Sequence, residues 1–137
     1  MDRNIRITKL DYIRLSKLIT SARKEMTAEL KSLNILEYEL IRADKVISEK
    51  IDPEYITMNS VVQIYNHDIE KLMTIKIVYP EDADFKKNYN SVLSPLGGAL
   101  IGYKENDTLR FEVPKGEIRI TIQKIEYQPE SEGNYLV

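Results

Sequence analysis

The 137-residue sequence contains no cysteine, no tryptophan and a single histidine. Without cysteine the chain can form neither a disulfide framework nor a thiolate metal site. The histidine, His67, lies beside Asp68 in an expected polar turn. A lone histidine needs other ligands to hold a metal ion, so we interpret His67 as a solvated turn residue. The lack of cysteine also fits a reducing compartment.

Long hydrophobic runs are missing as well. The longest apolar run near the middle, residues 75–79, is interrupted by Lys76. No stretch approaches the roughly 20 apolar residues that span a bilayer. The first fifteen residues carry charges throughout, which predicts that they are not a secretory signal peptide. We therefore expect a cytoplasmic protein that does not enter a membrane.

Charge of either sign is not in large excess, because the formal net charge is −2. General nucleic-acid binders gain most of their affinity from cationic contacts to phosphates, so this balance argues against that class. The net charge is compatible with binding to a protein partner that itself holds nucleic acid. Hydrophobic residues make up 42% and charged residues 31%, as in folded proteins. The length predicts one domain, or one domain with an appendage.

The first part of the chain, up to about residue 47, repeats with helical periodicity. A first helix is expected to begin near Thr8, whose hydroxyl can cap the amide of Asp11. Its apolar stripe comprises Leu15, Leu18, Ile19, Ala22, Met26, Leu30 and Leu33. We expect a turn at residues 32–34 and a second, antiparallel helix over residues 36–47. The first helix, about 36 Å long, would then outreach the second, about 20 Å, and its first turns would pack on the second half of the chain.

The second half repeats with strand periodicity after a charged linker at residues 48–55. Strands are expected at residues 56–65 and 72–79. A final strand at residues 118–127 should form a hairpin in which residues 109–113 pair with residues 118–122. Residues 81–90 are polar and predict a loop. A short helix should follow, capped by Ser94, begun by Pro95 and ended by Gly102. The fold class is therefore α+β, with four main strands and one short helix.

No constellation with clear chemistry emerges from these elements. The glycines at positions 97, 98 and 102 lack the spacing of a phosphate loop, so close packing of the short helix explains them better. The carboxylates of Glu81, Asp82 and Asp84 share a loop without the calcium-binding pattern. No Ser-His-Asp or Cys-His set can be assembled. We expect no cofactor, no metal and no enzymatic activity.

Several ordered segments nevertheless resemble a known family. The segments DADFKKN (82–88), SVLSPLGGALIGYKENDTLRF (91–111), PKGE (114–117) and the strand ending IEY (125–127) resemble the C-terminal domain of Gre-type transcript cleavage factors. The segments LEYELIRADKVI (36–47), ITMNSVV (56–62) and YQPESEGNY (127–135) are similar to the Rnk-type regulators of that family, which have a shortened coiled coil. The resemblance covers residues 36–135 and rests on several motifs at compatible spacing.

The resemblance implies a two-part organisation and a partner. Residues 1–52 would form a short antiparallel coiled-coil hairpin, and residues 53–137 an FKBP-like β-sheet domain. In this family the loop with the Ser-Pro pair contacts bacterial RNA polymerase at the rim of its secondary channel, and DNA is approached only through the transcription complex. The corresponding docking residues are Leu93, Ser94, Pro95 and Leu96. Many Gre proteins carry an acidic residue near this pair, where this chain has Leu93. A helix cap followed by a first-turn proline explains Ser94 and Pro95 without a partner.

The expected hairpin tip departs from the Gre pattern. Gre factors carry an acidic tip of the form DLxENAEY, whereas the expected tip here reads KSLNILEY, with Asn34 and Glu37 as its polar residues. We therefore expect a regulator of transcription elongation that competes with Gre factors without stimulating transcript cleavage. Two alternatives remain, an FKBP-like peptidyl-prolyl isomerase and a regulator of nucleotide-metabolising enzymes. The oligomeric state stays open.

Overall fold

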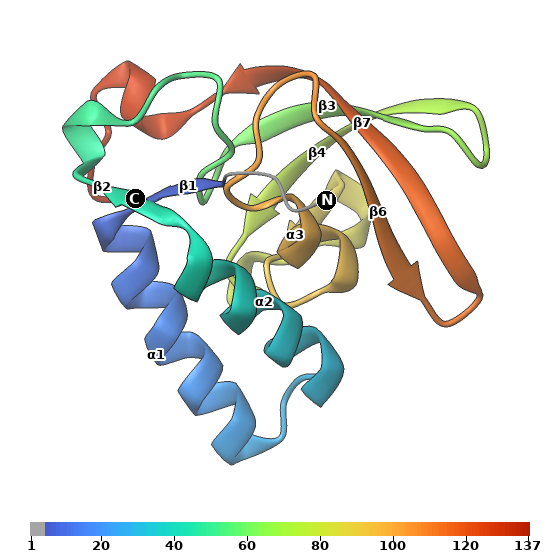
Figure 1. The fold of residues 1–137 in the computed structure, drawn as a ribbon, viewed down its shortest axis with the longest axis horizontal. Coiled ribbons are helices and arrows are strands. Elements are labelled where there is room, and N and C mark those ends of the chain that lie inside the picture. Colours follow the sequence, from blue (N-terminus) through green and yellow to red (C-terminus); the bar gives the residue numbers. More distant parts are fainter. Residues whose placement is uncertain (1–4) are drawn as a thin grey trace.

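The computed structural model describes residues 5–137, which form an α+β chain with a helical hairpin beneath a curled sheet (Figure 1). The first part contains β1 (Arg6–Thr8), α1 (Lys9–Glu25), α2 (Leu30–Arg42), β2 (Asp44–Val46) and the 3-10 turn η1 (Ser48–Lys50). The second part contains β3 (Val61–Asn66), β4 (Lys71–Val78), η2 (Pro80–Asp82), η3 (Phe85–Lys87), β5 (Tyr89–Ser91), α3 (Pro95–Leu100), β6 (Thr108–Val113), β7 (Gly116–Tyr127) and η4 (Pro129–Glu132). The predicted fold class is confirmed.

The helical hairpin is antiparallel, but its turn lies earlier than the sequence predicted. Helix α1 begins as expected, with the Thr8 hydroxyl accepting the Asp11 N–H at 3.0 Å. It ends at Glu25, and the next residue, Met26, caps it with a left-handed backbone at φ of 57°. The turn is therefore at residues 26–29, and the expected turn at residues 32–34 is wrong. With 17 and 13 residues, the helices are about 26 and 20 Å long.

The hairpin turn was misplaced because the helical spacing of the apolar residues continues through the observed turn. Met26, Leu30 and Leu33 follow one another at spacings of four and three, as on a continuous helix. In the structure Leu33 is buried, whereas Met26 is 86% exposed and Leu30 is 63% exposed. Met26 and Leu30, which were expected on the apolar stripe of one helix, are therefore not part of the core. Neither helix is long and apolar enough to cross a membrane, and the same holds for every helix in the described part of the chain.

The main sheet has five strands in the order β5-β4-β3-β7-β6. All neighbours are antiparallel except β4 and β5. The predicted alternation in β3 is confirmed, because Val62 and Ile64 are buried while Val61 and Gln63 are half-buried. The predicted hairpin of the last two strands is also confirmed, with Phe111 opposite Ile118. Residues 56–60 precede β3 rather than extending it, and β5, within an expected loop, is a fifth strand.

A second, two-stranded parallel sheet fastens the base of the helical hairpin. It pairs β1 with β2, two strands of three residues each that the sequence argument missed. The Arg6 N–H donates to the Gly102 carbonyl at 3.0 Å, so β1 also contacts the segment after α3. Gly102 has φ of +84°, and a Cβ there would lie 3.2 Å from the Ile7 side chain. Glycine is needed at this crossing for both reasons.

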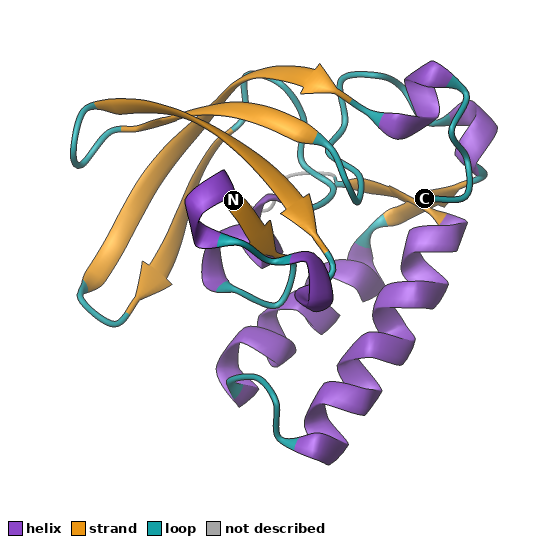
Figure 2. Ribbon diagram, turned by 180° about the vertical axis from the view of Figure 1, so that it is seen from behind, coloured by secondary structure: helices purple, strands orange, loops and turns teal. Residues whose placement is uncertain are grey.

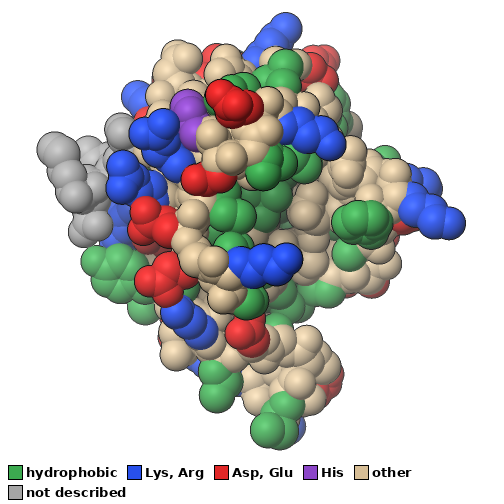
Figure 3. All heavy atoms as spheres, turned by 90° about the vertical axis from the view of Figure 1, so that its right-hand side faces the viewer, with side chains coloured by type: hydrophobic (Ala, Val, Ile, Leu, Met, Phe, Trp, Pro, Cys, Tyr) green, Lys and Arg blue, Asp and Glu red, His purple; other side chains and the backbone are tan. Residues whose placement is uncertain are grey.

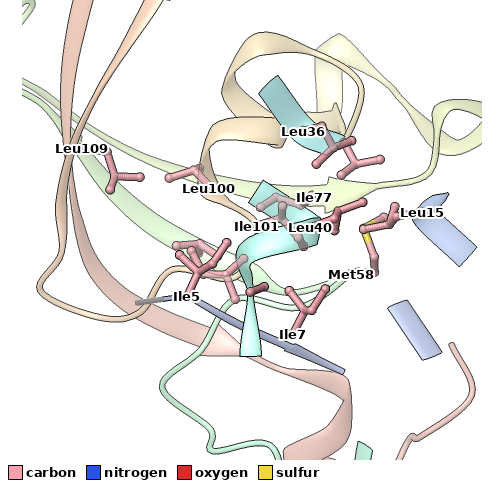
Figure 4. Close-up of a cluster of buried hydrophobic side chains, with 14 of the residues drawn as sticks. Ile5, Ile7, Leu15, Leu36, Leu40, Met58, Ile77, Leu100, Ile101 and Leu109 are labelled. Atoms are coloured by element: carbon pink, nitrogen blue, oxygen red, sulfur yellow. The ribbon is translucent and has the colours of Figure 1, made fainter. Parts of the chain in front are cut away.

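One hydrophobic core joins the hairpin to the sheet. The labelled side chains in Figure 4 come from both parts and point toward one another. Leu15 and Leu40 from the hairpin share this buried cluster with Ile77 of β4 and Leu100 of α3. Residues 1–4 of the expected first unit lie outside the described residues, and the boundary at residues 52 and 53 stays a prediction.

A buried polar cluster fixes the first turn of α1 against the sheet domain. Asp11 is 1% exposed, and its carboxylate accepts the Met58 N–H at 3.1 Å. Nearby, the Thr57 hydroxyl donates to the Glu130 carboxylate at 2.7 Å. Burial raises the pKa of Asp11 to about 6, with a smaller contribution from the Glu130 charge, and burial also raises the pKa of Glu130. As expected, the first turns of α1 pack on the second half of the chain.

Candidate functional site

Residues 91–96, which we call the docking turn after the role that the family resemblance predicts for it, are held by a compact set of hydrogen bonds. The Ser94 hydroxyl donates to the Ser91 carbonyl at 2.6 Å and accepts the Gly97 N–H at 3.2 Å. The Ser91 hydroxyl accepts the Leu93 N–H at 3.0 Å. Pro95 occupies the first position of α3, where its missing N–H costs nothing. The predicted cap and first-turn proline are both confirmed.

Gly97 lets α3 sit directly on the docking turn. A Cβ at this position would lie 2.2 Å from the Ser91 carbonyl oxygen, far inside van der Waals contact. At Gly98 the corresponding distance, to the Val92 carbonyl oxygen, is 3.0 Å. Close backbone approach explains both glycines, so the interpretation of the glycine-rich run as a packing feature is confirmed.

The four predicted docking residues divide into two pairs. Ser94 and Pro95 line an open groove, while Leu93 and Leu96 pack against the hydrophobic core. All four side chains are half-buried. Ser94 and Pro95 are therefore available to a partner at the groove, and Leu93 and Leu96 hold the turn in place.

The groove has a volume of about 230 Å³ and lies between α2, α3 and β6. Its apolar lining includes Ile35, Pro95 and Phe111. On the face drawn in Figure 3, hydrophobic side chains line a hollow that acidic and basic side chains surround. At the rim the Lys31 ammonium donates to the Glu112 carboxylate, which holds the pKa of Glu112 below its usual value. This surface combines an apolar floor with charged edges.

The contributions of α2 and β6 to the groove were not predicted from the sequence. Lys31, Ile35 and Phe111 lie far from the Ser-Pro pair in the sequence, and only tertiary packing brings them together. One signal was present, since Ile35 is an apolar residue that does not belong to the buried stripe of α2, and it is 48% exposed.

The two residues predicted at the hairpin tip lie within α2 instead. Arg23 of α1 binds both of them, donating to the Glu37 carboxylate at 2.8 and 2.9 Å and to the Asn34 side-chain oxygen at 2.7 Å. Hydrogen bonding to Arg23 holds the pKa of Glu37 below its usual value. Asn34 and Glu37 thus face α1, away from the groove, and the two predicted surfaces are not brought together.

The observed tip carries carboxylates that the sequence argument did not consider. Glu25 ends α1 and Glu29 is the residue before α2, and both are exposed. Met26 and Leu30, beside them, are also exposed. The tip is therefore a mixture of apolar and acidic side chains.

Two other sequence candidates are accounted for by local contacts. His67 lies in a turn as predicted; it is half-buried and its Nε2 atom is 2.6 Å from the Thr121 hydroxyl, so it is only partly solvated. In the acidic loop, the Asp84 carboxylate accepts the Lys86 N–H at 3.0 Å. Within residues 5–137, three or more histidine or acidic side chains nowhere gather into a potential metal site.

Comparison with known families agrees with this geometry. Residues 51–127 match the family model described as the C-terminal part of transcription elongation factor GreA/GreB. The match covers more than half of the chain and includes the docking turn, α3, β6 and β7. The chain belongs to the GreA/GreB family of transcription elongation factors.

Individual relatives show where in the family the chain falls. The "Regulator of nucleoside diphosphate kinase" of Escherichia coli K12 is 32% identical over 111 residues, covering 80% of this chain and 82% of that protein. GreA of Pelobacter propionicus is 36% identical over 93 residues, or 68% of this chain and 59% of GreA. The solved GreA/GreB structure from Nitrosomonas europaea matches with a TM-score of 0.72 and 32% identity, covering 92% of this chain and 100% of that one. The expected resemblance to Rnk-type members is confirmed.

Proposed function

We propose that this chain binds bacterial RNA polymerase at the rim of the secondary channel, through the docking turn and the adjoining groove. It would compete there with Gre factors and would not stimulate transcript cleavage. The observation that carries the proposal is the prefolded docking turn, which presents Ser94 and Pro95 on an open groove in a chain of the GreA/GreB family. DNA would be approached only through the polymerase, and the protein would act in the cytoplasm.

The hairpin supports a role without cleavage. Transcript hydrolysis by two metal ions needs carboxylates placed close together at the catalytic centre. The observed tip offers only Glu25 and Glu29, on opposite sides of the turn and without the acidic Gre motif. Glu37 is bound to Arg23. Helices of 17 and 13 residues also give a short reach, about 26 Å at most.

Equilibrium binding to core RNA polymerase tests the docking surface. Pro95→Glu replaces the proline with a residue that also suits the first turn of a helix, but it adds a charge beside the apolar groove. Gln123→Glu on the outer side of β7 is the matched control, because it adds the same charge to an exposed position. We expect Pro95→Glu to weaken binding about tenfold or more and Gln123→Glu to have no effect. Unchanged binding by Pro95→Glu would contradict docking at this turn.

The isomerase alternative gains no support from the groove. Such an activity calls for an aromatic-lined pocket, and Phe111 is the one aromatic residue among the described residues that line the groove. The implied fold alone does not establish the function.

A second candidate function rests on the name of a relative. The relative from Escherichia coli K12 is named a regulator of nucleoside diphosphate kinase. If this chain acts in that way, adding it to the kinase should change phosphate transfer between nucleotides at micromolar concentrations. Unchanged kinase turnover would exclude this second function and leave polymerase binding as the remaining proposal.

A further inference from the structure

A phenylalanine side chain stands almost free of the rest of the chain. Phe85 begins η3 and is 95% exposed, more than Met26 at the hairpin tip, at 86%. Single exposed apolar residues are common on protein surfaces and need no explanation by themselves. Phe85 differs because the loop that presents it is firmly built.

Backbone hydrogen bonds close the loop on both sides of Phe85. Asp84 and Tyr89 exchange two backbone hydrogen bonds, both at 3.0 Å. Inside this bridge the Asp84 carboxylate accepts the Lys86 N–H, also at 3.0 Å. The left-handed Asn88 donates its N–H to the Phe85 carbonyl at 3.2 Å. A side chain held on such a loop loses little backbone freedom when it binds a partner.

The loop leads directly into the docking turn. Tyr89 begins β5, which pairs with β4 and ends at Ser91. The Ser91 carbonyl then accepts both the N–H and the hydroxyl of Ser94. Figure 2 shows the short turns and β5 grouped together in front of the sheet. One hydrogen-bonded segment therefore holds Phe85 near one end and Ser94 near the other.

Charges of opposite sign flank Phe85 in the sequence. Asp82 precedes it and Lys86 follows it, and both side chains are exposed. No ion pair joins Lys86 to a described residue. A partner that encloses the ring would gain most if its own rim were acidic on the side of Lys86 and basic on the side of Asp82.

We propose that Phe85 is a second anchor of the polymerase contact and inserts into an apolar pocket with such a mixed-charge rim. The inference rests on the proposed function and adds a residue that would tune affinity for the polymerase. Buried aromatic anchors carry a large share of the binding energy at protein interfaces, and the flanking charges set orientation and association rate.

Removing the ring tests the anchor cleanly, because the side chain is so exposed that Phe85→Ala leaves the fold intact. Binding of labelled variants to core RNA polymerase is measured by fluorescence anisotropy, with thermal melting as the check on folding. We expect Phe85→Ala to raise Kd about tenfold and Phe85→Leu to raise it less. Ile69→Ala is the matched control, since Ile69 is 60% exposed in the turn between β3 and β4, and its Kd should not change.

The mixed-charge rim proposed for the polymerase pocket is tested by reversing the charges of Lys86 and Asp82. Lys86→Glu and Asp82→Lys should each weaken binding at low salt, and the difference should shrink as salt is added. If the wild-type chain binds polymerase and Phe85→Ala binds with the same Kd, this inference is overturned and the proposed function stands. No binding of the wild-type chain to polymerase would overturn the proposed function, and the inference with it.

Discussion

The docking turn and the hairpin tip are held in different ways. In the docking turn, backbone contacts fix the geometry, because α3 approaches Ser91 more closely than any residue with a Cβ would permit at Gly97. Near the tip, side chains on the surface do this work, through the contacts of Arg23 with Asn34 and Glu37. The last residues of the tip, Met26 and Leu30, are largely exposed.

The two regions would therefore suit different roles. The docking turn would suit binding, and the hairpin tip would tolerate changes of sequence. If the docking turn contacts a partner as proposed, it would present the same shape before and after binding. Near the tip, one partly exposed ion pair between Arg23 and Glu37 joins the two helices, and such pairs contribute little to stability, so this part of the chain can change its sequence at little cost to the fold. Under the proposed function, the docking turn would keep its contact geometry even where the sequence of the tip changes.

The largest expected effect comes from adding a side chain where α3 makes close contact with the docking turn. Gly97→Ala should lower the free energy of unfolding by about 3 kcal/mol, because the added methyl group overlaps the Ser91 carbonyl. Gly98→Ala, with a longer contact of 3.0 Å, should cost less. Urea denaturation of both variants measures the difference. Equal losses, or a larger loss for Gly98→Ala, would show that backbone contact does not fix the docking turn.

The base of the hairpin should respond to pH. Because burial raises the pKa of Asp11 from 3.8 to about 6, the folded chain holds a proton there more tightly than the unfolded chain does. The stability that Asp11 contributes is therefore fully present below about pH 4 and is lost as the pH rises through about 6. Asp11→Asn keeps an oxygen that can accept the Met58 N–H and removes the charge, so it should stabilise the protein by roughly 3 kcal/mol at pH 8 and by much less at pH 4. Melting curves across this range, with exposed Glu49→Gln as control, measure the effect, and a pH-independent difference would contradict it.

The cap of α3 should contribute less than the close contact beneath it. Ser94→Ala removes the acceptor for the Gly97 N–H and should cost about 1 kcal/mol, whereas Ser94→Asp keeps an acceptor at the cap and should cost less. Thermal unfolding distinguishes the two variants. If Ser94→Asp is as destabilised as Ser94→Ala, the hydroxyl contributes through its bond to Ser91 instead.

The smallest effect is expected at the hairpin. Arg23→Ala removes the contacts to Asn34 and Glu37, yet the free energy of unfolding should fall by less than about 1 kcal/mol because these groups are exposed to solvent. A double-mutant cycle with Glu37→Gln measures the pair directly, and added salt should reduce it. A coupling of several kcal/mol would show that the tip is as firmly built as the docking turn.

The sequence predicted the docking turn well because its determinants are local. Ser94, Pro95 and the glycines that follow lie within a few residues of one another, and capping and turn chemistry act over that distance. The hairpin turn was misplaced because Thr27, Ala28 and Glu29 contain no glycine or proline, while the apolar spacing continues through Met26. Asn34 was a plausible turn residue, but its neighbour Leu33 is buried in α2.

Features that depend on distant parts of the chain could not be read from the sequence. The strands β1 and β2 are only three residues long, too short for a periodic signal. The groove needs Ile35 and Phe111 beside Pro95, and the raised pKa of Asp11 depends in part on Glu130 near the other end of the chain. Such contacts appear only once the helices have packed on the sheet.

The central claim, docking without cleavage, is tested most directly in stalled transcription complexes that carry a labelled transcript. The chain is added alone and in excess over GreA, and release of transcript fragments is followed over time. We expect no cleavage by the chain alone and a dose-dependent loss of cleavage by GreA, with the loss reduced for Pro95→Glu. Cleavage stimulated by the chain itself, abolished by Glu25→Gln or Glu29→Gln, would contradict the claim, and so would undiminished GreA activity at saturating concentrations.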